Sequence, residues 1–163
     1  MLGIFLFSAT RAHCTGFLFT KSIQWGEMHF VLIKNPDASM KLAYSTARVI
    51  YAQTGATSLP LVEAVASTIA NASVKNNRSI SDIISDSCFF EVLNHESKNH
   101  NRLYQEPTSR GFQMCLRVAT RMLHGTLPDC VFGATRFHHA NTLPEWAVSR
   151  GYIADIDNFL FYI

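Results

Sequence analysis

The stretch Gly-Ala-Thr-Arg-Phe-His-His-Ala-Asn at residues 133–141, together with Ile-Asp-Asn-Phe-Leu-Phe-Tyr at residues 156–162, decides the fold of this chain. Both stretches are short, rich in aromatic residues and adjoin residues that favour turns, a pattern typical of β-strands. We expect strands over residues 134–138 and 158–162 that pair antiparallel. The C-terminal part of the chain therefore predicts a small sheet.

The sequence upstream of this sheet predicts helices. Apolar residues recur there at spacings of three and four, and residues that start or stop helices stand at the ends of each segment. The pattern predicts three main helices over residues 37–52, 60–72 and 109–124, and a shorter one over residues 80–85. Residues 94–109 are polar and aperiodic, which indicates a surface loop. The expected fold class is α+β, a helical body with a small antiparallel sheet. We expect helices to start at Ser58, Ser79 and Ser109, and the first helix to end at Gly55.

Composition indicates one globular domain with an extension. The chain has 163 residues, 48% hydrophobic and 16% charged, which is enough to bury a core. Its net charge of +2 comes with no basic cluster, which argues against nucleic acid as a partner. We assign residues 1–35 to an N-terminal extension and residues 36–163 to the functional domain. The apolar residues 1–9 are too few to span a bilayer and lack the basic start of a regular export signal, so a degenerate signal stays one interpretation.

Three motifs in the C-terminal part occur in the order seen in a known family. They are Gly-Ala-Thr-Arg-Phe-His at residues 133–138, Pro-Glu-Trp at residues 144–146 and Ile-Asp-Asn-Phe-Leu-Phe-Tyr at residues 156–162. This order resembles that of bacterial cell-wall hydrolases of the spore cortex-lytic type, whose motifs read Gly-Ala-Thr-His-Tyr-His, Pro-x-Trp and Ile-Gly-x-His-x-Phe-Tyr. The resemblance extends over roughly residues 43–163.

The resemblance implies a lysozyme-like fold and a glycan-cleaving enzyme. Family members cleave peptidoglycan between N-acetylmuramic acid and N-acetylglucosamine and are described as lytic transglycosylases that leave an anhydro-sugar. The partner implied is therefore the glycan strand of peptidoglycan, with no cofactor and no stable membrane span. The location implied is the cell envelope, either the periplasm or the outside of the cell.

The resemblance also implies a catalytic position. The family's general acid is the Glu of a Tyr-x-Glu-Ala/Thr-x-Gly motif, and this chain reads Tyr-Ala-Gln-Thr-Gly-Ala at residues 51–56, which puts Gln53 at that position. Cleavage needs a proton delivered to the leaving oxygen, and the C-terminal end of a helix would favour the protonated form of a Glu there. Gln53 has nearly the same shape but no transferable proton. We expect the chain to be inactive or impaired as written. The alternative is a non-catalytic peptidoglycan-binding protein.

Further residues are expected to contact the sugar. Alternating residues of a strand point to the same side, so Thr135 and Phe137 should share one face, with Arg136 and His138 on the other. Trp146 has two interpretations, stacking on a sugar ring or anchoring the core. A metal on His138 is a further alternative, but no second His follows at a spacing that metal sites use, so we expect no metal. The expected substrate-binding residues are Tyr51, Asn71, Ser87, Phe89, Thr135, Phe137, His138 and Trp146.

Three other carboxylates are candidates for the general acid. Glu63, Asp86 and Glu91 could in principle replace the missing acid, although acids of this kind mostly lie solvated on protein surfaces.

Of the four cysteines, Cys88 and Cys115 resemble positions where relatives often carry Cys. The resemblance implies that these two lie close together and could form a disulfide. Buried free thiols are the alternative.

Overall fold

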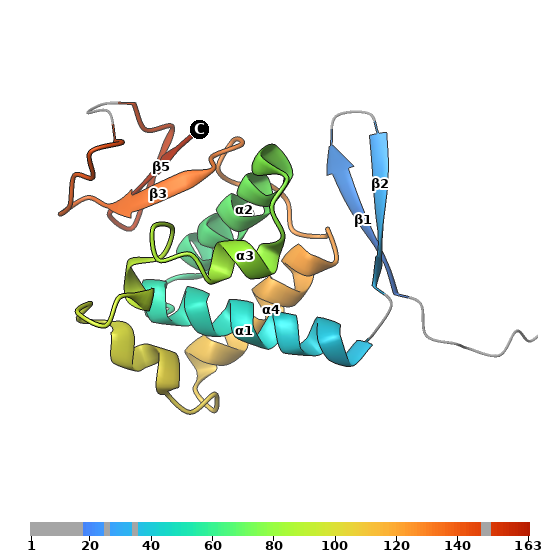
Figure 1. The fold of residues 1–163 in the computed structure, drawn as a ribbon, viewed down its shortest axis with the longest axis horizontal. Coiled ribbons are helices and arrows are strands. Elements are labelled where there is room, and N and C mark those ends of the chain that lie inside the picture. Colours follow the sequence, from blue (N-terminus) through green and yellow to red (C-terminus); the bar gives the residue numbers. More distant parts are fainter. Residues whose placement is uncertain (1–17, 25–26, 34–35, 148–150) are drawn as a thin grey trace, which may run out of the picture.

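The computed structural model describes residues 18–24, 27–33, 36–147 and 151–163 (Figure 1). These residues form an N-terminal hairpin, a helical body and a C-terminal sheet, so the α+β class is confirmed. The elements in chain order are β1 (Leu18–Gln24), β2 (Glu27–Ile33), α1 (Pro36–Thr54), α2 (Leu59–Asn76), α3 (Ile80–Ile84), the 3₁₀ turns η1 (Glu91–Leu93) and η2 (His100–Tyr104), α4 (Arg110–Leu123), β3 (Arg136–His139), β4 (Ala154–Ile156) and β5 (Phe159–Tyr162).

The ends of the helices follow local signals in the sequence. Ser58, Ser79 and Ser109 each cap a helix, because each side-chain oxygen accepts a hydrogen bond from a backbone N–H of the first turn, at 3.2, 3.1 and 3.1 Å. Gly55 follows α1 in the left-handed conformation (φ +64°), as its position predicted. Helix α2 continues past its expected end because Asn77, also left-handed with φ 50°, is the residue that closes it.

The core lies where α1, α2 and α4 meet. Ala47 and Ile50 of α1, Ile69 of α2 and Phe112 of α4 are all buried. The Phe112 ring packs 5.1 Å from the ring of Tyr44, measured between centroids, which holds α4 against α1. This packing fixes the direction in which the C-terminal end of α1 points, and the candidate site lies at that end.

The C-terminal sheet has the order β3-β5-β4 and is antiparallel throughout. The expected pairing of the two aromatic strands is confirmed, and Figure 1 shows their sheet beside α2. Strand β4 was missed because it has only three residues. It is joined to β5 by Asp157 and Asn158, which both have positive φ (50° and 63°) and so make the tight turn that hairpins favour.

The segment 94–109 was expected to be a loop without regular structure, and the structure corrects this. Leu103 in η2 is buried, and Arg48 of α1 donates a hydrogen bond to the Leu103 carbonyl oxygen. A single apolar anchor thus orders a short 3₁₀ turn inside a segment whose other residues are polar. The consequence is that this polar segment is held beside α1.

The disulfide expected from the resemblance is also wrong. Cys88 and Cys115 are free thiols. Cys115 is fully buried on the core side of α4, where burial raises the pKa of its thiol to about 12, whereas Cys88 is exposed on the turn before η1. Among the cysteines that the structure describes, the alternative of a buried free thiol holds for Cys115 alone.

Candidate functional site

A groove of about 930 Å³ opens at the C-terminal end of α1. One wall comes from the end of α1, the start of α2 and the polar segment around η1 and η2. The opposite wall comes from the residues that follow β3 and from the turn between β4 and β5. The residues that line the groove are Gln53, Thr54, Thr57, Ser58, Glu91, Glu96, Ser97, Lys98, Asn99, Arg102, His139, Asn141, Thr142, Asp157, Asn158 and Phe159.

Gln53 lies in the last turn of α1 and borders this groove. Its side-chain oxygen Oε1 is buried, and no described residue donates a hydrogen bond to it. A buried acceptor without a donor is unfavourable by about 1–3 kcal/mol. Gln53 therefore lies at the boundary between the packed interior, where its oxygen is buried, and the groove that its side chain helps to line.

Gly55 brings a cation close to Gln53. A Cβ atom at Gly55 would lie 2.9 Å from Nη1 of Arg102, so a larger residue there would push the guanidinium away from this position. The left-handed backbone of Gly55 ends α1 at the same place. Arg102 lines the groove as a result, next to the residue that the resemblance implies as catalytic.

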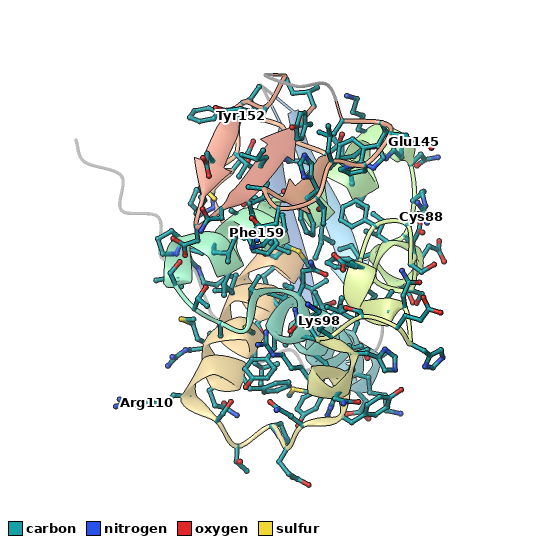
Figure 2. The ribbon with its side chains drawn as sticks, turned by 90° about the vertical axis from the view of Figure 1, so that its left-hand side faces the viewer. Cys88, Lys98, Arg110, Glu145, Tyr152 and Phe159 are labelled. Atoms are coloured by element: carbon teal, nitrogen blue, oxygen red, sulfur yellow. The ribbon has the colours of Figure 1, made fainter. Side chains whose placement is uncertain are left out.

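The two walls of the groove are tied together at one end. Ser58 caps α2 and also donates a short hydrogen bond from Oγ to the Asp157 carboxylate on the β4–β5 turn. Phe159, the first residue of β5, is buried and also lines the groove. Figure 2 shows Phe159 above Lys98, which marks the span of the groove from the sheet to the polar segment.

The groove contains charged groups of both signs. Glu91, Glu96 and Asp157 supply carboxylates, while Lys98 and Arg102 supply cations. Glu91, Glu96 and Lys98 are exposed, so solvent screens their charges. The groove is therefore polar and close to neutral, as suits a ligand that is recognised through hydrogen bonds.

Two of the three alternative acids are unsuited to proton donation. Glu63 pairs with Arg121, with 2.8 Å between Oε1 and Nη1, and lies outside the groove. Asp86 pairs with Arg78 at 2.9 Å, and this guanidinium hydrogen bond lowers the pKa of the carboxyl below its ordinary 3.8. An acid with a lowered pKa is ionised near neutral pH and has no proton to give. Of the three, only Glu91 lines the groove.

The Asp86–Arg78 pair makes stability depend on pH. Because the pKa of Asp86 is lowered in the folded state, its stabilisation is present above the ordinary value of 3.8 and is lost as pH falls through the folded value. Asp86→Asn should lower the free energy of unfolding by about 0.5–1 kcal/mol at pH 7, and the difference from the unsubstituted chain should shrink in acid. Urea unfolding of both chains at neutral and at acidic pH measures this. Asp82→Asn, which removes no side-chain ion pair, is the control and should show no such pH dependence.

Several expected binding residues lie outside the groove. Tyr51 packs on Phe112 and its hydroxyl bonds to Gln105 at 3.1 Å. Asn71 donates to Asp129 and to the Ala134 carbonyl, so it fastens α2 to the loop that leads into β3. These contacts are within the protein, and Asn71 also lines a separate cavity of about 440 Å³ beside α2. Ser87 is exposed and lines none of the described cavities.

The expected residues of the β3 region divide between two sides of the sheet. Phe137 faces the helical body, while His138 lies on the outer side, with Nε2 3.1 Å from the Tyr162 hydroxyl. A second cavity of about 170 Å³ is lined in part by the other expected residues of this region, which are Phe89, Thr135, Phe137 and Trp146. The groove beside Gln53 receives His139 instead of His138. His139 could have been predicted from the sequence, because alternation along the strand puts it on the same side as Thr135 and Phe137.

Comparisons with known proteins agree with the sequence motifs. Residues 62–162 match the family model described as Cell Wall Hydrolase, which is more than half of the chain. The matched segment includes the sheet side of the groove and begins after Gln53. No curated protein and no solved structure matches the chain. Among the described residues, no group of His, Cys, Asp or Glu could hold a metal ion, and no helix is both long and apolar enough to cross a membrane.

Proposed function

Because this chain belongs to the cell-wall hydrolase family, we propose that it acts on the glycan strands of peptidoglycan in the cell envelope, through the groove beside Gln53. The observation that carries the proposal is the position of Gln53, at the end of α1 and on the rim of a large polar groove. We place the activity in residues 36–163, with the fold of a lysozyme-like enzyme of the spore cortex-lytic type.

The composition of the groove supports a sugar ligand. Its walls present amides and hydroxyls that can both donate and accept hydrogen bonds, among them Asn99, Asn141 and Thr142. Phe159 also lines the groove but is only 6% exposed, so the lining available to a ligand is mainly polar. A linear glycan carries hydroxyl and acetamido groups along its length and requires such a combination of contacts.

The reaction proposed is the cleavage of a lytic transglycosylase. A general acid protonates the glycosidic oxygen, the bond from the muramyl C1 to that oxygen breaks, and the muramyl 6-hydroxyl oxygen bonds to C1 while a base accepts its proton. The product is an anhydro-muramyl end. Position 53 is the place for the acid, and with Gln53 the protonation step has no donor there.

A non-catalytic binding protein is the second candidate. One observation favours this candidate: the residue that lines the groove at the position of the family's acid is Gln53, which has no acidic proton. Such a chain would hold the glycan without cleaving it. The two candidates differ in whether soluble fragments appear after binding.

Binding to purified peptidoglycan tests the proposal. We expect the chain to sediment with insoluble peptidoglycan but not with cellulose, and to release few fragments. Asn99→Ala combined with Asn141→Ala should weaken binding about tenfold, because each substitution removes hydrogen bonds that contribute about 0.5–1.5 kcal/mol. Asn94→Ala combined with Asn101→Ala, two exposed asparagines that do not line the groove, is the matched control. Equal binding by the two double variants would contradict the placement of the glycan in the groove.

A further inference from the structure

We propose that the second cavity, at the free edge of β3, binds a carboxylate of the peptide stem of peptidoglycan, with Arg136 as the residue that selects stem-bearing glycan. This inference rests on the proposed function. It adds a peptide subsite about which the family match and the catalytic position say nothing.

The cavity combines cations with an aromatic surface. Its walls include Arg78, Arg136 and Asn76 together with Trp146, Phe89 and Thr135. At about 170 Å³ it is much smaller than the groove and matches the end of a side chain better than a sugar strand. It lies beside an edge strand, because β5 is the single described strand that pairs with β3.

The charges in the cavity favour an anion. Arg78 is neutralised by Asp86, at 2.9 Å, and Asp86 is the one carboxylate among the residues that line the cavity. Arg136 forms no ion pair with a described residue. The cavity lining therefore holds two guanidinium groups and one carboxylate, and the positive charge without a partner is that of Arg136. An incoming carboxylate would be the first anion to pair with it, in the geometry that a guanidinium prefers.

The Arg136 side chain is held in place for this contact. Its guanidinium carbon lies 5.4 Å from the centroid of the Trp146 ring, within the range of a cation–π contact. Trp146 in turn packs edge-on against Tyr162 at 5.5 Å and against His138 at 5.6 Å. A cation that is already oriented loses less entropy when it binds, so the contact can be strong although Arg136 is exposed.

The cavity also lies within reach of a ligand in the groove. Arg136 precedes His139 by three residues on β3, which is about 10 Å along the strand, and its side chain lies on the opposite side of the strand from His139, so a stem that joins the two sites would cross the edge of β3. A peptide stem branches from the muramyl sugar and carries free carboxylates, and an extended residue spans about 3.5 Å. A stem of three or four residues can therefore start at the groove and place a carboxylate at Arg136.

The test compares two forms of one glycan. Fragments that keep their stems and fragments stripped of them by an amidase are titrated against the full chain and two variants. We expect the chain to bind stem-bearing glycan about tenfold or more tightly than stripped glycan, because hydrogen bonds to charged groups have that strength. Arg136→Gln should abolish this preference and leave affinity for stripped glycan unchanged. Arg110→Gln removes the same charge from the start of α4, far from Cys88 and Glu145 in Figure 2, and should change neither affinity.

The outcomes separate this inference from the proposed function. If Arg136→Gln keeps the full preference for stems, the subsite is overturned while glycan binding in the groove stands. If neither glycan binds, the proposed function fails, and the free stem peptide then decides the subsite. Binding of that peptide that is lost in Arg136→Gln supports the subsite, and absence of binding overturns it. The preference should also decrease as ionic strength rises, because Arg136 is exposed.

Discussion

Replacing Gln53 with Glu is expected to raise the rate of peptidoglycan cleavage by about 10²–10⁴-fold, the usual contribution of a general acid. The substitution adds a proton donor without changing the length of the side chain. The C-terminal end of α1 and the partial burial of position 53 should both raise the pKa of the new carboxyl, against the opposing effect of the Arg102 guanidinium in the same groove. Activity should then fall as pH rises through that pKa, because only the protonated form donates. Turbidity of a peptidoglycan suspension measures the rate.

Gln113→Glu is the matched control for this prediction. It makes the same chemical change on an exposed face of α4, outside the groove, and should leave the rate at that of the chain as written. Full cleavage by the chain as written would mean that another residue is the acid. Glu91→Gln would then be the next variant to measure, because Glu91 is the candidate carboxylate that lines the groove.

Phe137→Ala is expected to lower the free energy of unfolding by about 3–5 kcal/mol, as substitutions of buried phenylalanines do. This would be a large part of the total, since small proteins are stable by about 5–15 kcal/mol. The reason is that Phe137 is buried where the sheet packs on the helical body. Its ring packs at centroid distances of 5.7–6.1 Å against four other rings, those of Phe89, Phe90, Phe159 and Phe161.

Phe132→Ala provides the comparison for Phe137→Ala. Phe132 is 77% exposed and precedes the same strand, so its loss should change stability by no more than about 0.5 kcal/mol. Chemical denaturation of both variants gives the two values. A similarly small effect for Phe137→Ala would show that the ring serves the ligand alone and that the sheet is held by other contacts.

The positions of the helices could be predicted because their signals are local. Ser58, Ser79 and Ser109 cap the helices that they were expected to start, and Gly55 ends α1. The pairing of β3 with β5 could also be predicted, since both strands are short aromatic segments close in sequence. Each cap joins residues within a few positions of one another, and the paired strands β3 and β5 are separated in the chain by one short strand, β4.

The site could be predicted only in part because it depends on contacts between distant segments. Nothing local indicates that Arg102 lies over Gly55, or that Ser58 reaches the Asp157 carboxylate 99 residues later. The side of the strand that reaches the groove was likewise decided by packing, which turns His138 outward toward Tyr162. Position 53 was predicted from a family resemblance, whereas the groove beside it could be recognised only in the structure.

Mass spectrometry of the fragments that the Gln53→Glu variant releases from purified peptidoglycan tests the central claim most directly. The account predicts soluble muropeptides with anhydro-muramyl ends, in amounts far above those released by the chain as written. Fragments cut within the peptide stems, or equal release by the two chains, would contradict the assignment of glycan cleavage to the groove at position 53.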